Sequence, residues 1–137
     1  MGLILDTSIL IASERRGEAI EEILHQARVA HGEFDLALSS ISAIELTHGI
    51  SRARTVAQRD HRRAFAAEIF RDLVVHPVSL AIAQLAGQIE GEQAAKGVSI
   101  AIEDLIIGAT ALHLGFDAAT LNVKHFRLIP GLRIVTL

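Results

Sequence analysis

The sequence contains no cysteine, tryptophan or tyrosine, and only two prolines among its 137 residues. Without cysteine the chain has no disulfides, no thiolate metal site and no cysteine nucleophile, which suits a reducing cytoplasm. Its only aromatic residues are five phenylalanines, so a single-strand binder built on aromatic stacking is disfavoured. No apolar run has the length of a membrane span, and the N-terminus lacks the features of a signal peptide. We therefore expect a cytoplasmic protein.

Half of the residues are hydrophobic, which is enough to build a core and excludes intrinsic disorder. The length suits one domain, and no linker or repeat divides it, so we expect a single domain over residues 1–137. The net charge is −3, from 13 basic and 16 acidic residues. Six of the basic residues lie between Arg52 and Arg71, where only Asp60 and Glu68 oppose them. Such a local basic patch can serve a polyanion on a mildly acidic protein.

Short apolar segments alternate with stretches of helical periodicity along the chain. The strands are expected at 3–5, 34–38, 118–121 and 133–136. The helices are expected at 9–16, 18–30, from Ser42 onward, 56–74, 80–96 and 102–114. Short apolar strands separated by helices predict an α/β fold, with a parallel sheet covered on both faces. In such sheets ligands collect beyond the carboxyl ends of the strands.

Two acidic residues follow predicted strands and are candidates for this edge. Asp6 comes directly after the strand 3–5, where it serves either as a helix N-cap or as an active-site carboxylate. Glu45 lies in Ser-Ala-Ile-Glu-Leu at 42–46, where Ser42 and Glu45 also have the spacing of a capping box. Its apolar flanks favour a partly desolvated position beside the preceding strand.

Asp104 is the third candidate, and its neighbours favour an inward position. Asp104, Gly108 and Ala111 share one face of the helix predicted at 102–114. Small residues on that face would let the helix approach the sheet closely. Glu103 points elsewhere around the same turn, so we prefer Asp104.

Three carboxylates at one sheet edge repel one another, so they take up protons or bind a cation. The chain has no cysteine and no zinc-type histidine motif, and oxygen ligands alone suit a hard ion such as Mg²⁺ or Mn²⁺. The matching chemistry is metal-assisted hydrolysis of a phosphodiester, in which the ion polarises the phosphoryl group and activates a water.

These segments resemble PIN-domain ribonucleases, and specifically the VapC toxins of type II toxin–antitoxin pairs. The resemblance covers essentially the whole chain. It rests on the order of four segments, namely LILDTS at 3–8, SAIEL at 42–46, IEDLIIGA at 102–109, and ATLNVKHF at 119–126 leading into IPGL at 129–132. It implies a three-layer α/β/α fold and an endoribonuclease, a hydrolase acting on ester bonds, that leaves a 5′-phosphate and a 3′-hydroxyl. It also implies a homodimer and a small antitoxin partner.

The resemblance further implies roles for individual residues. Asp6 and Asp104 would hold Mg²⁺, with Mn²⁺ as a substitute. Glu45 would complete the acidic cluster, directly or through water, and help to position or deprotonate the attacking water. Thr7 or Ser8 would hydrogen-bond a metal ligand or a substrate phosphate.

The chain departs from the family where a fourth acid often lies. Residues 120–126 offer Asn122 and His125 instead. Asn122 would contact the site from the strand opposite Asp6, and His125 would steer a water, pair with phosphate or cap the strand end. Asp117 would lie at the wrong end of its strand. The missing acid leaves an alternative function open, that of a PIN-fold module that binds RNA or protein without cleaving.

The basic residues make a separate prediction about the helix at 56–74. Arg59 and Arg62 fall near the same stripe as Phe65 and Ile69, and burying two arginines would be costly. The N-terminal end of this helix should therefore protrude from the core. There it would contact RNA, a second subunit or an acidic partner, or simply expose its arginines to solvent.

Overall fold

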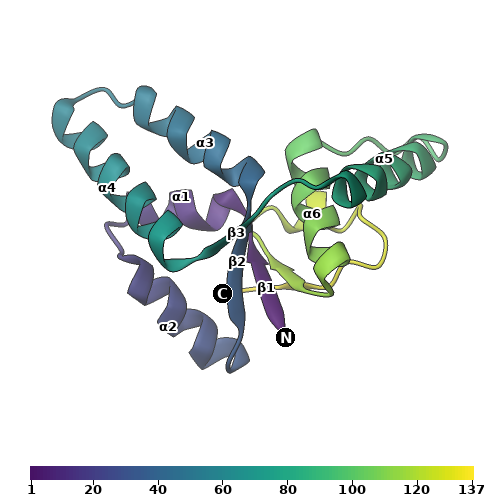
Figure 1. Cartoon of the computed structure of the whole chain (residues 1–137), viewed down its shortest axis with the longest axis horizontal. Coiled ribbons are helices and arrows are strands. Elements are labelled where there is room, and N and C mark those ends of the chain that lie inside the picture. The colour runs from purple at the N-terminus through teal and green to yellow at the C-terminus, as the bar shows by residue number, and fades with distance from the viewer.

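The computed structural model describes residues 1–137 and contains one five-stranded sheet with helices on both faces (Figure 1). All neighbouring strands are parallel, in the order β3-β2-β1-β4-β5. The strands are β1 (Gly2–Leu5), β2 (Asp35–Ser39), β3 (Val74–His76), β4 (Asp117–Ala119) and β5 (Ile134–Val135). This is the predicted α/β/α architecture with a central parallel sheet.

Seven helices connect and cover the strands. They are α1 (Thr7–Arg15), α2 (Ile20–His31), α3 (Ser40–Ser51), α4 (Val56–Asp72), α5 (Leu80–Ala94), α6 (Ile102–Leu114) and α7 (Val123–Phe126). None of them combines the length and hydrophobicity needed to span a lipid bilayer.

The strand β1 builds both faces of the core because its side chains alternate across the sheet. Leu3 and Leu5 pack into a cluster with α1 to α4, whereas Ile4 packs into a second cluster with α5, α6 and α7. All three side chains are completely buried. A central parallel strand buried on both sides explains why this segment is a continuous apolar run.

Two elements were not predicted from the sequence. The helix expected to run to residue 74 ends at Asp72, and Val74–His76 forms the edge strand β3. The β-branched Val74 and Val75 favour an extended backbone there, and pairing with β2 completes it. The helix α7 is a single turn, too short to produce a periodic signal.

The start of α3 also differs from the prediction. The helix begins at Ser40, and Ser39 is its N-cap, with the Ser39 hydroxyl accepting from the Ile41 amide at 3.3 Å. Ser42 and Glu45 therefore lie within the helix and do not form a capping box. The capping interpretation of Glu45 was wrong, and its carboxylate is free for another contact.

The helices α3 and α4 form an arm that projects away from the sheet (Figure 1). The first turns of α4 are exposed, and its burial begins at Phe65, apart from a half-buried Arg62. The predicted protrusion of this helix end is confirmed. The cause is the one expected, since polar and charged side chains occupy the positions that would otherwise enter the core.

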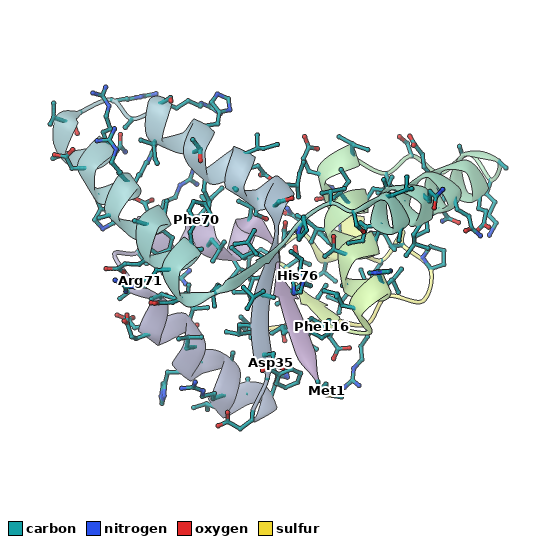
Figure 2. All side chains as sticks on the ribbon, viewed as in Figure 1. Met1, Asp35, Phe70, Arg71, His76 and Phe116 are labelled. Carbon is teal, nitrogen blue, oxygen red and sulfur yellow. The ribbon has the colours of Figure 1, made fainter.

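Two glycines permit close contacts that position neighbouring segments. A Cβ on Gly2 would lie 2.3 Å from the ring of Phe116, a ring that also meets His76 edge-on (Figure 2). A Cβ on Gly108 would lie 2.4 Å from the Ile129 side chain. Gly108 therefore admits the segment after α7, while α6 also packs against β1, β2 and β4, in agreement with the expected approach to the sheet.

Candidate active site

Asp6 lies at the carboxyl end of β1, between the sheet and α1. It is only 4% exposed, and its backbone amide donates to the carbonyl of Ala119 at 2.8 Å. Although Asp6 occupies the N-cap position of α1, its side chain makes no capping hydrogen bond. Its Oδ2 instead accepts hydrogen bonds from the hydroxyls of Ser8 and Thr120, each at 2.7 Å. Asp6 therefore does not cap α1 through its side chain. Its carboxylate faces the sheet edge and is held there by two hydroxyls.

Thr120, which was not among the predicted site residues, connects Asp6 to the end of β4. Its hydroxyl donates to Asp6 and accepts from the backbone amide of Asn122 at 2.9 Å. The Ser8 hydroxyl lies 3.4 Å from the Thr120 hydroxyl and accepts from the Leu121 amide at 3.1 Å. The sequence placed Thr120 inside the strand expected at 118–121, and no local pattern could show a partnership that spans 114 residues.

Glu45 reaches the same edge from α3. Its Oε1 accepts a hydrogen bond from the Thr7 hydroxyl at 3.1 Å, and that hydroxyl also hydrogen-bonds the buried Ser42 Oγ at 2.9 Å. The bond attaches the first turn of α1 to α3. Thr7 is therefore beside Glu45, and Ser8 is beside Asp6.

Asp104 enters from the first turn of α6 and is 9% exposed, whereas the adjacent Glu103 is exposed. This arrangement agrees with the preference for Asp104 as the inward-facing acid. The Nδ1 of His125, on α7, lies 3.3 Å from Asp104 Oδ2. His125 is thus a partner of Asp104 and does not cap the strand end.

Asp6 lies close enough to Asp104 and Glu45 to raise the pKa of each of them. The pKa of Asp104 is raised by burial first and then by the charge of Asp6, against a lowering by His125. The pKa of Glu45 is raised by burial, and further by the charges of Asp6, Glu103 and Asp104. Like charges act this way only at short range, so residues from distant parts of the sequence share one electrostatic environment.

The donor set at this edge suits a hard divalent cation. No lysine or arginine forms an ion pair with Asp6, Glu45 or Asp104, so their charge is not compensated by the chain except by His125. As they stand, no three acidic or histidine side chains converge tightly enough to enclose a metal ion. Mg²⁺ commonly takes only one or two protein carboxylates and fills its shell with water and substrate oxygens, which fits this open arrangement.

The other residues considered in the sequence form no hydrogen bond or ion pair with Asp6, Glu45 or Asp104. The side chain of Asn122 is exposed and forms no hydrogen bond. Asp117 lies at the amino end of β4, as expected, with its Oδ2 3.5 Å from Arg133 Nε. Arg59 is exposed on α4, while Arg62 donates to the carbonyl of Gly49 at 2.7 Å.

The sequence profile described as the PIN domain matches residues 3–131. The chain belongs to the PIN domain family. Within the family it is similar to VapC proteins along nearly its whole length.

Ribonuclease VapC1 of Rickettsia felis is 30% identical over 136 residues, which cover 99% of this chain and 96% of that protein. Ribonuclease VapC of Rickettsia bellii is 31% identical over 137 residues, with the same two coverages. Both alignments therefore span this PIN domain essentially from end to end.

Solved structures of VapBC complexes share the fold. The VapBC2 complex of Rickettsia felis bound to a promoter DNA fragment aligns over 100% of this chain and 99% of that chain, with a TM-score of 0.84 and 22% identity. The DNA-bound VapBC of Salmonella typhimurium aligns over 99% of this chain and 98% of that chain, with a TM-score of 0.83 and 26% identity.

Proposed function

We propose that this PIN-domain protein is a divalent-metal-dependent endoribonuclease and the toxin of a type II toxin–antitoxin pair. The observation that carries the proposal is the meeting of Asp6, Glu45 and Asp104 at one sheet edge, where burial first and then neighbouring carboxylates raise the pKa of Glu45 and Asp104. The curated relatives named Ribonuclease VapC support the reaction. The VapBC complexes among the structural neighbours support an antitoxin partner, and the family resemblance adds a homodimer.

In this proposal Asp6 and Asp104 hold Mg²⁺ or Mn²⁺. When bound, the ion supplies Lewis-acid polarisation of the phosphodiester and lowers the pKa of a water. The two hydroxyls on Asp6 Oδ2 fix the direction of that carboxylate, leaving Oδ1 available to the ion. His125 holds Asp104 through Oδ2 in the same way.

Glu45 orients the water that attacks phosphorus. Because the Thr7 hydroxyl donates a hydrogen bond to Oε1 of Glu45, Oε2 is the oxygen available to accept a proton from that water. A raised pKa makes Glu45 a better proton acceptor than an ordinary solvent-exposed glutamate. Attack by this water on phosphorus, from the side opposite the 3′-oxygen, breaks the bond between phosphorus and the 3′-oxygen. The 3′-oxygen leaves and takes up a proton from solvent, so the products are a 5′-phosphate and a 3′-hydroxyl.

The test is an RNA cleavage assay with and without chelator, comparing the wild-type chain with Asp6→Ala and Asp104→Ala. We expect Mg²⁺-dependent cleavage by the wild type and loss of cleavage in both variants. Circular dichroism of each variant checks that the fold is retained. Cleavage that persists in chelator would contradict the metal mechanism, and a folded wild type inactive on every RNA tried would favour a module that binds without cleaving.

A further inference from the structure

A hollow of about 620 Å³ lies between α1 and the arm formed by α3 and α4. Three of its lining residues, Ile11, Leu46 and Phe65, are apolar, while most of its lining is polar or charged. Four arginines line it, Arg15, Arg52, Arg54 and Arg62. Figure 2 shows several nitrogen-tipped side chains around the turn that joins α3 and α4. We call this feature the basic hollow.

Three of these arginines have no partner within the chain. Arg15, Arg52 and Arg54 form no ion pair, and no hydrogen bond involves their guanidinium groups. This is unexpected in a protein whose 16 acidic residues outnumber its 13 basic ones. Unpaired guanidinium groups gathered around one hollow form a field that attracts an anion.

Two acidic residues, Glu14 and Glu45, line the hollow, and Glu14 is already engaged within the chain. Glu14 Oε1 lies 2.9 Å from His61 Nδ1 and 4.0 Å from Arg62 Nε. Arg62 also donates to the Gly49 carbonyl at 2.7 Å. These contacts join α1, α3 and α4, so the walls of the hollow are already in place before any ligand binds, and Glu14 is occupied.

The hollow is continuous with the acidic edge, because Glu45 lines the hollow and also accepts the hydrogen bond from Thr7 beside Asp6. We infer that the basic hollow binds the phosphate backbone of the substrate RNA on the Glu45 side of the cleaved bond, with Arg15, Arg52 and Arg54 as phosphate contacts. The inference rests on the proposed ribonuclease function and assigns the path of the substrate strand.

A nucleic-acid backbone fits this hollow better than an acidic protein segment. The guanidinium groups come from the end of α1 and from the α3–α4 turn, so they present separate binding points for successive phosphates. A strand bound there would extend directly to the carboxylates that are proposed to hydrolyse it. Because Glu45 would repel either polyanion, it is this continuity with the carboxylates, and not charge alone, that favours the RNA backbone.

The experiment measures RNA binding in chelator, where metal-dependent cleavage does not occur. A fluorescein-labelled oligouridylate is titrated with the full chain and followed by fluorescence anisotropy. The variants are Arg15→Gln and the double variant Arg52→Gln/Arg54→Gln. Arg63→Gln is the matched control, because Arg63 is exposed on the same arm but does not line the hollow.

We expect each lost arginine to raise the Kd by about twofold to fivefold, as for an exposed ion pair. The slope of log Kd against log salt should flatten by about 0.7 for each phosphate contact removed. The control should bind like the wild type. With Mg²⁺, the hollow variants should show a higher KM for the same RNA and an almost unchanged kcat.

Unchanged RNA binding by the hollow variants, with the wild type still cleaving, would overturn the inference and leave the proposed function intact. Binding through the hollow by a chain that never cleaves would instead refute the ribonuclease proposal alone. If polyglutamate binds the hollow and the oligouridylate does not, the ligand is an acidic protein and the RNA path is wrong. A loss equal to that of Arg63→Gln would mean that net charge alone is responsible, which also overturns the inference.

Discussion

The acidic edge and the basic hollow leave their charges uncompensated in different ways. At the edge, Asp6 and Asp104 are buried and held by hydroxyls and by His125, so their direction is fixed. In the hollow, Arg52 and Arg54 are exposed and unpaired on a protruding turn. The edge is thus organised for a small ion that demands defined geometry, whereas the hollow suits a flexible polyanion that needs only positive charge.

Glu45 borders both regions, so its substitution gives the sharpest separation between them. Glu45→Gln should lower kcat by about a hundredfold or more, as expected when a general base is removed. The same change should leave RNA binding in chelator unchanged or slightly tighter, because it removes a negative charge beside the hollow. Single-turnover kinetics and anisotropy measure the two effects. A parallel loss of binding would mean that Glu45 acts mainly through the shape of the hollow.

Thr120→Val tests how far the hydroxyls organise the edge. The variant keeps the side-chain shape but removes the donor to Asp6 and the acceptor of the Asn122 amide. We expect about a tenfold loss of metal affinity or activity, as for other residues that hold a metal ligand. The matched control is Thr110→Val, since Thr110 is also buried but donates only to the Ile106 carbonyl within α6. Equal effects in both variants would remove any special role for Thr120.

The raised pKa values of Glu45 and Asp104 predict how stability depends on pH without metal. A carboxyl group whose pKa is raised by folding binds more protons in the folded state, so its stabilising contribution is present at low pH and is lost as the pH rises through the raised pKa. The metal-free Tm of the wild type should therefore fall relative to that of Asp104→Asn as the pH rises from the ordinary pKa of a carboxyl group through the raised pKa of Asp104.

Added Mg²⁺ should reverse this relative loss at neutral pH, because the ion stabilises the charged carboxylates. Thermal melts at several pH values, with and without Mg²⁺, provide the measurement. Glu18 acts in the opposite sense, since hydrogen bonds from Arg16 and Ser13 lower its pKa to about 2, and its contribution changes only in more acidic solution. A difference between the two chains that does not vary with pH would contradict the prediction.

Arg59→Gln should produce the smallest effect of the series. Arg59 lies on the arm but does not line the hollow, so it acts on RNA only through the screened field of its charge. We expect less than about a twofold rise in Kd at physiological salt. Anisotropy under the conditions used for Arg52→Gln/Arg54→Gln gives the comparison. A larger effect than in that double variant would place the RNA along the outer face of α4 instead.

Local patterns predicted much of this protein. The apolar run at residues 3–5 produced the central strand, and the periodicity of residues 102–114 matched α6 to the residue. The exposure of Arg59 followed from the same reasoning, because a charged residue on an apolar stripe marks the point where a helix leaves the core. Asp6 and Asp104 could be proposed because each lies at the end of a strongly patterned element.

Only the tertiary structure decided which groups meet. The bond between Thr120 and Asp6, the contact of His125 with Asp104 and the link from Thr7 to Glu45 join distant segments. The edge strand β3 depends on pairing with β2, and the basic hollow depends on the packing of α1 against the arm. Periodicity and capping reflect the energetics of neighbours along the chain, whereas these contacts arise from the order of strands in the sheet, which no local pattern encodes.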